Sequence, residues 1–214
     1  MFNGRFWLFM AALGVFSTPG LATLVTYTTA SSFASANTDQ TFQSLTFPTL
    51  TGSSTSYTDL STGILFTSTS GLSVVDNPNA WAAPASGNVL RTNSPGGTIV
   101  ITLPTTARSF SIYLGGVFTF LDAQISVANG GGGSYSQGLS QSLGLSTPAF
   151  WGVRSDSAIT SLTLVANVGN EYLEIGPGQL GAPAAEAPEA ATMLLIGTGL
   201  IILRFLRRKP KLAE

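Results

Sequence analysis

Apolar residues alternate with polar ones over short runs through the middle of this chain. In the clearest run, residues 97–104 (GTIVITLP), Ile99, Ile101 and Leu103 fall on one side of an extended strand and Val100 on the other. Successive side chains of a strand point to opposite faces, so this period of two predicts a strand with one buried face. We expect Ile101 to be buried in a central strand. Similar runs cover residues 42–47, 63–68, 71–76, 109–116, 123–130, 150–156, 159–167 and 171–178.

Turn-forming residues separate these runs, and the chain contains 24 glycines and 11 prolines. Many short strands with turn signals between them are typical of an antiparallel sandwich or a jelly roll. The sequence therefore predicts an all-β fold, an antiparallel β-sandwich or jelly roll. We also expect one short helix over residues 29–37 with Thr29 as its N-cap, and a mobile hairpin connection from Gly130 to Gly133.

Two residue types are missing: the chain has no cysteine and no histidine. Disulfides, a Ser-His-Asp triad, a cysteine nucleophile and a histidine-ligated zinc are therefore excluded within this chain, as is a haem held by His or Cys. We expect no cofactor and no catalytic residues.

Charged residues make up only 9% of the chain. Residues 23–186 carry three arginines and eight acids, so the body is mildly acidic and has no basic patch. Nucleic-acid binding depends on Lys and Arg that neutralise phosphates. The composition therefore argues against a nucleic-acid partner.

The N-terminal segment, residues 1–22, has the pattern of a secretory signal peptide. Arg5 precedes an apolar run over residues 6–16, and Gly20 and Ala22 place small side chains at the −3 and −1 positions of a cut after Ala22. We expect signal peptidase to cleave there and the ectodomain to span residues 23–180.

The C-terminal segment has the pattern of a membrane anchor. A Pro/Ala linker over residues 181–190 precedes an apolar stretch over residues 191–206, which we expect to be a single transmembrane helix. Arg204 can extend its charge to the interface, and the basic residues of 207–214 then stop the helix in the membrane. The stop consists of Arg204, Arg207, Arg208 and Lys209. Positive charge stays on the cytoplasmic side, so we expect the ectodomain outside.

This tail resembles a PEP-CTERM sorting signal, in which a Pro-Glu box, a short transmembrane helix and a terminal arginine cluster follow a secreted domain. Pro188 and Glu189 match the box, and Ala190 stands where the family has a second proline. The resemblance implies processing by exosortase in a Gram-negative bacterium that makes exopolysaccharide. The chain would then reach the inner membrane, with its ectodomain in the periplasm, and afterwards the cell surface or extracellular matrix.

The order of the last three runs is also similar to that of many PEP-CTERM ectodomains. These runs are residues 150–156, 159–164 and 172–176. Such domains resemble carbohydrate-binding β-sandwiches. The resemblance implies a carbohydrate-associated role for the ectodomain.

Few residues are candidates for a ligand site. Trp81 lies among turn formers and Trp151 lies next to Phe150 in a strand, so that one of these two aromatic side chains must point outward. Each tryptophan is either packing or a platform for a sugar ring. Asp76, Asn77 and Asn79 offer oxygen ligands of the kind calcium prefers, but too few for a site.

A glycoside hydrolase needs two carboxylates about 5–10 Å apart across a cleft. Glu171 and Glu174 are three residues apart in an expected strand, which sends them to opposite faces. The sequence thus predicts a non-enzymatic surface or matrix protein associated with exopolysaccharide. A carbohydrate-binding module with an aromatic platform is the alternative, and a glycan-active hydrolase is the third reading.

Overall fold

The computed structural model describes residues 23–48, 52–76, 84–116, 120–142, 147–167 and 169–184. This part of the chain is all-β, with one short helix, α1 (Ala30–Ala36). The strands are β1 (Leu24–Tyr27), β2 (Gln40–Leu45), β3 (Ser54–Asp59), β4 (Ile64–Val75), β5 (Val89–Thr92), β6 (Thr98–Thr102), β7 (Ser109–Gly116), β8 (Phe120–Asn129), β9 (Ser134–Ser142), β10 (Ala149–Ser155), β11 (Ile159–Ala166) and β12 (Leu173–Pro183).

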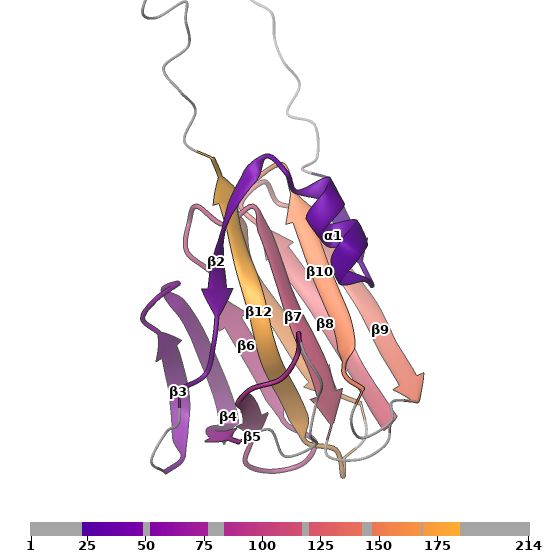
Figure 1. The fold of residues 1–214 in the computed structure, drawn as a ribbon. Helices are drawn as coiled ribbons and strands as arrows, with labels where there is room; N and C mark the ends of the chain where they lie inside the picture. Colours follow the sequence, from indigo (N-terminus) through magenta and orange to yellow (C-terminus); the bar gives the residue numbers. More distant parts are fainter. Residues whose placement is uncertain are drawn as a thin grey trace, which may run out of the picture.

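The strands form one antiparallel hydrogen-bonded network that curls over on itself into a sandwich-like shape (Figure 1). The order along the main path is β1-β10-β7-β12-β5-β4-β6-β11-β8-β9, while β2 pairs with β12 and β3 with β4. The front layer holds β2, β12, β7 and β10, and the back layer holds β6, β11, β8 and β9. β4 and β5 connect the two.

Alternating residues of the back layer build one half of the core. Ile99, Ile101 and Leu103 are all buried, as the period of two predicts, and Ile101 has no exposed surface. In the register of the sheet, Ile101 lies between Phe66 of β4 and Leu162 of β11, which are also buried. Burial of such side chains is the main favourable term in folding.

The front layer supplies the other half. Ile112 and Leu114 of β7 point inward, and Trp151 of β10 lies beside Ile112 in the register. Leu173 and Ile175 of β12 join the same cluster. Trp151 and Val153 of β10 face the core. The alternating residues Phe150 and Arg154 therefore lie on the outer face of this layer.

The predicted helix and hairpin are both present. The Thr29 side chain accepts a hydrogen bond from the Ser32 N–H at 3.3 Å, so Thr29 is the N-cap of α1 as expected. Between β8 and β9, the Gly132 N–H donates to the Asn129 carbonyl and the Asn129 N–H to the Gly133 carbonyl. Gly132 has φ 78°, a left-handed conformation that suits glycine and closes a three-residue hairpin loop.

The last strand differs from its prediction in both bounds. β12 begins at Leu173, so Glu171 precedes the strand, and β12 continues to Pro183 rather than ending before residue 181. Gly181 and Ala182 pair with Phe42 and Thr41 of β2. The small residues of this segment are typical of a linker, but their backbone groups pair with β2, and this pairing extends the strand.

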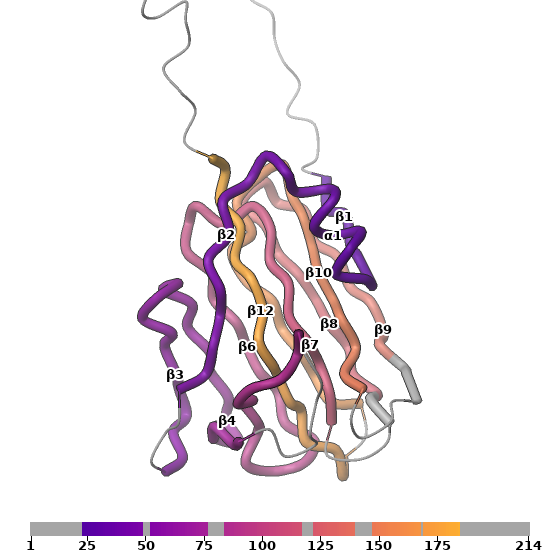
Figure 2. Tube along the Cα trace, viewed as in Figure 1, coloured from indigo at the N-terminus to yellow at the C-terminus, as the bar shows by residue number. Residues whose placement is uncertain are grey.

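β1 begins and β12 ends at the same end of the sandwich (Figure 2). Gly20, Ala22, Trp81, Pro188 and Glu189 lie outside the described residues, and so does the basic stop Arg204, Arg207, Arg208 and Lys209. Within the described ranges, no helix has the length and apolar character needed to cross a bilayer.

Candidate ligand-binding groove

A groove of about 470 Å³ lies on the outer face of the front layer. Its floor comes from β2, β12, β7 and β10, which lie side by side in Figure 1, and α1, Pro84 and Ser86 border it. The described residues that line it are Ala30, Phe33, Ala34, Ser44, Leu45, Thr46, Pro84, Ser86, Ser111, Tyr113, Phe150, Pro177, Gly178 and Gln179. A concave, mostly apolar surface with a few polar groups is the usual form of a small-ligand site.

Two aromatic rings stand in this groove because their neighbours face the core. Tyr113 lies between the inward Ile112 and Leu114, and Phe150 precedes the buried Trp151. Both rings are half-buried, and their centroids are 5.4 Å apart in an edge-to-face arrangement. They offer apolar ring surface at the floor of an open groove.

The polar groups of the groove are neutral. Ser111 and Gln179 are opposite each other in the β7–β12 register, and Ser44 lies opposite Gln179 on β2. None of the described lining residues is charged. Such a groove provides hydroxyl and amide hydrogen bonds beside aromatic rings, without a charge that would select an ionic ligand.

Phe33 fixes the helical wall of the groove. Its ring is 1% exposed and lies 5.9 Å from the Phe150 centroid and 5.7 Å from that of Phe42. Gly152 makes this seat possible, because a Cβ at that position would come within 2.7 Å of the Phe33 Cδ2. The helix therefore rests on the sheet through one ring above one glycine.

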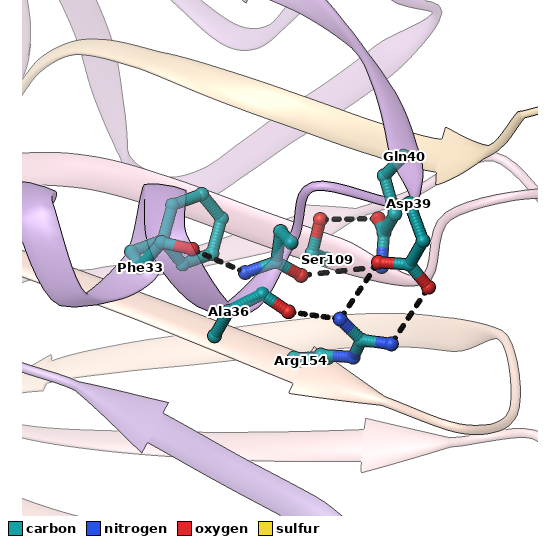
Figure 3. A network of polar contacts seen from close by, with 7 residues as sticks. Phe33, Ala36, Asp39, Gln40, Ser109 and Arg154 are labelled. Atoms are coloured by element: carbon teal, nitrogen blue, oxygen red, sulfur yellow. Dashed lines mark hydrogen bonds and ion pairs between the residues drawn. The ribbon is translucent and has the colours of Figure 1, made fainter.

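A polar network holds the C-terminal end of α1 against the sheet (Figure 3). Arg154 of β10 donates two hydrogen bonds of 2.8 Å to the Asp39 carboxylate and another to the Ala36 carbonyl. These bonds to the Arg154 side chain hold the pKa of Asp39 below its ordinary value. Asp39 is solvent-exposed, so we assign this pair a positioning role rather than a large share of stability.

Three further bonds complete the network in Figure 3, one of them from the Gln40 side-chain N–H to the Asn37 side-chain oxygen at 3.2 Å. The Asn37 side chain donates to the Phe33 carbonyl at 2.7 Å, and the Ser109 hydroxyl donates to the Gln40 side-chain oxygen at 2.6 Å. Asn37 is buried, so its amide replaces the hydrogen bonds that the last turn of the helix lacks. The chain from Phe33 to Gln40 is thereby fixed on β7 and β10.

Tyr113 keeps its phenol proton at neutral pH. Burial raises the pKa of Tyr113 above its already high ordinary value, because the charged phenolate loses hydration. The hydroxyl is therefore available as a donor or an acceptor. This behaviour suits recognition of ligand hydroxyls.

Trp151 is not a ligand platform. Its side chain is 1% exposed within the core, and its indole N–H lies 3.5 Å from the side-chain oxygen of Gln137. The outward member of the aromatic pair is Phe150. Sequence reasoning did not select Phe150, Tyr113 or Phe33 for the site, although the alternation around Ile112 already turned Tyr113 outward.

The two acids considered for hydrolysis are both buried and neither lines the groove. Glu174 lies 3.9 Å from the Arg91 guanidinium, and a Glu171 oxygen accepts the Asp122 N–H at 3.2 Å. Burial, more than the nearby Asp122 charge, raises the pKa of Glu171. The described residues contain no group of three acidic side chains placed to hold a metal. Of the three residues weighed as calcium ligands, only the exposed Asp76 is among them.

No family model and no curated protein matches this chain. Among solved structures, it is similar to an exo-beta-1,3-galactanase from Phanerochaete chrysosporium with galactose (TM-score 0.32, 14% identity), over 62% of this chain and 30% of that one. TmCBM61 in complex with beta-1,4-galactotriose gives a TM-score of 0.30 at 12% identity, over 56% of this chain and 84% of that one.

The enzymatically active domain of bacteriophage CBA120 tailspike protein 4 gives a TM-score of 0.25 at 13% identity, over 65% of this chain and 19% of that one. The chain thus spans less than a third of the galactanase and of the tailspike chain. At TM-scores this far below 0.5, none of these likenesses assigns a family or a function.

Proposed function

We propose that this chain is an exported, non-enzymatic surface protein whose ectodomain binds a neutral glycan in the groove of the front layer. The observation that carries the proposal is that the Tyr113 and Phe150 rings line the same groove as the exposed Ser44 and Gln179 side chains. The axial C–H face of a sugar ring is apolar, so it packs against aromatic rings, while its hydroxyls bond to neutral side chains. Exopolysaccharide is the glycan that such a surface protein meets.

The strand order supports a more specific fold. Strands β5-β12-β7-β10 are neighbours in one half of the path and β6-β11-β8-β9 in the other. With β5 to β12 counted as strands one to eight, these orders are 1-8-3-6 and 2-7-4-5, and we infer a jelly roll. Lectin domains are among the proteins that use jelly rolls, but the argument for binding rests on the groove, since one fold serves many functions.

A matrix role is the second candidate, and the outer face of the back layer favours it. In the register of that layer, Thr67, Val100, Thr163, Ser126 and Ser136 form a row across five strands. A face of neutral hydroxyls suits contact with hydrated polysaccharide over a large area. Adhesion through this face and binding in the groove are compatible.

Export and sorting complete the proposal. The N-terminal pattern before Thr23 and the tail from Pro188 onward support delivery to the periplasm, anchoring in the inner membrane, and release or transfer to the surface by exosortase. The ectodomain of residues 23–184 would then act outside the cell.

A glycan panel tests the proposed binding. The full chain in mild detergent is applied to immobilised neutral and anionic polysaccharides, with and without calcium, and released reducing ends are measured in parallel. We expect binding to neutral glycans that does not depend on calcium and does not release sugars. Binding only to anionic glycans, or release of reducing ends, would contradict the proposal.

A further inference from the structure

β9 is an open edge of the sheet. It pairs with β8 in one unbroken register, from Ala128 opposite Ser134 to Phe120 opposite Ser142, and it ends the strand path of the described residues. β1, at the other end of the path, contacts β9 through the Thr26 hydroxyl, 3.5 Å from the Tyr135 hydroxyl, and shares no backbone pairing with it. Figure 2 shows both strands at the same edge of the sandwich.

Proteins usually protect such an edge with a charge, a proline, a bulge or a very short strand. β9 has none of these: its nine residues, SYSQGLSQS, contain no charged residue and no proline, and its register with β8 has no shift. Two other edges are better protected, since β1 has four residues and β3 contains Asp59 and a register shift against β4. β9 therefore offers a flat template for another strand.

The hairpin fixes which backbone groups of β9 face outward. Residue pairs of an antiparallel ladder alternate between pairs that exchange hydrogen bonds and pairs that do not. Asn129 and Gly133 form a bonded pair, with the Asn129 N–H 3.1 Å from the Gly133 carbonyl. By alternation, Ser134, Ser136 and Gly138 are in non-bonded pairs with β8, so their N–H and C=O groups point to the open side.

We propose that β9 pairs antiparallel with β9 of a second copy of this chain, about a two-fold axis that passes through Gln137. In this register Ser136 lies opposite Gly138 of the second copy, and outward backbone groups meet outward backbone groups. A two-fold contact needs a surface that is complementary to itself. An uncharged strand meets this need because the symmetry brings no like charges together.

The side chains favour the same register. Tyr135 lies opposite Leu139 of the second copy, and Leu139 opposite the second Tyr135. Both side chains pack against the core but are only half-buried at the end of the layer. Cross-strand pairing of an aromatic with an aliphatic side chain stabilises a sheet. The added strand would cover the apolar surface that the single copy leaves exposed.

The consequence is one continuous sheet through two copies, which carries the hydroxyl face of the back layer across both. Each dimer would also present two front-layer grooves to a polysaccharide chain, and two linked sites bind a repeating ligand more tightly than one. The pairing itself does not depend on what the groove binds.

Two variants at one position test the pairing by sedimentation velocity of the full chain in mild detergent. A Cβ at Gly138 meets no atom within 4 Å, so Gly138→Ala keeps the outward N–H without a steric penalty. Gly138→Pro removes that N–H, and it leaves every hydrogen bond between β9 and β8 in place. We expect wild type and Gly138→Ala to sediment as dimers and Gly138→Pro as a monomer that unfolds like wild type diluted below its dimer dissociation constant. A monomeric wild type, or equal dimerisation of both variants, would overturn the proposal.

Cross-linking tests the register. The native chain has no cysteine, so a disulfide in Gln137→Cys can form only with the same position of a second copy. The substitution also removes the oxygen that accepts from the Tyr135 hydroxyl and the Trp151 N–H, so its unfolding curve is compared with that of wild type. Residues in a directly opposed non-bonded pair have Cα atoms about 4.5 Å apart, within reach of a disulfide. We expect a covalent dimer on mild oxidation, and none for the control Gln124→Cys on β8. No cross-link at Gln137, or equal cross-linking of both variants, would overturn this arrangement. Absence of the cross-link is also the result expected if β9 pairs with a strand of another protein, and it overturns the proposal in that case too.

Discussion

Gly152→Ala tests how the groove is held in shape. The added Cβ would lie 2.7 Å from the Phe33 Cδ2, whereas carbon atoms in contact prefer about 3.5–4.0 Å. The helix and its ring must therefore shift by about 1 Å, and overpacking of this kind costs about 1–3 kcal/mol. Replacing a strand glycine with alanine returns about 0.5–1 kcal/mol, because the unfolded chain loses freedom. We expect a net loss of unfolding free energy.

A double-mutant cycle identifies Phe33 as the cause. Phe33→Ala removes a buried ring, for which the expected loss is about 3–5 kcal/mol. In that background the clash is gone, so Gly152→Ala should be neutral or stabilising by up to about 1 kcal/mol. The sign of the Gly152→Ala effect thus depends on whether the Phe33 ring is present.

The assay is urea unfolding of the full chain in detergent, with Gly138→Ala as the control glycine that has open space around its Cβ. Groups in contact give coupling energies well above the ~0.5 kcal/mol within which independent sites add. Gly152→Ala could instead leave the unfolding free energy of the wild type unchanged, with additive effects of the two substitutions. In that case Phe33 does not rest on Gly152, and this contact does not hold the helix at the groove.

Three further predictions follow from the core, a buried acid and the tail. Ile101→Ala should lower the unfolding free energy by about 2–5 kcal/mol, and a loss under ~1 kcal/mol in urea would place Ile101 outside the core. Because the pKa of Glu171 is raised, its contribution to stability is present below the unfolded pKa and is lost as pH rises through the folded one. Glu171→Gln should therefore flatten the fall in melting temperature as pH rises above the ordinary glutamate pKa of about 4.3, and an equal fall in both proteins would refute this. With one tag after Ala184 and another after Glu214, processing near Pro188-Glu189 should separate the two tags, and a single full-length membrane-bound band would show a permanent anchor.

The sequence predicted those strands and helices whose side-chain pattern and backbone preferences both favour the same structure. The alternation around Ile101 gave the inward face of β6, and Thr29 before a run of small residues gave the start of α1. In both places the side chains and the backbone favour the same structure, and no distant partner is needed to form it.

The remaining features depend on partners that are distant in sequence. The extension of β12 through Gly181 and Ala182 exists because β2 lies beside it, and no side chain at these positions indicates a strand. The groove likewise depends on the order of β10, β7 and β12 and on the seat of Phe33 above Gly152. The outward position of Tyr113 was readable from its neighbours, but its meeting with Phe150 was not.

The proposed glycan site is tested most directly by a binding titration of a neutral polysaccharide, chosen from the panel, with wild type, Phe150→Ala and Val165→Ala. Phe150 lies on the floor of the groove, and Val165 is an exposed apolar side chain on β11, in the other layer. Loss of one aromatic stacking contact of about 1–3 kcal/mol corresponds to a roughly 5- to 150-fold weaker Kd, by analogy with stacking on bases. We predict this weakening for Phe150→Ala alone, with little change between low and high salt because no described lining residue is charged. Equal affinity of all three proteins, or a Kd that rises steeply with salt, would contradict the account.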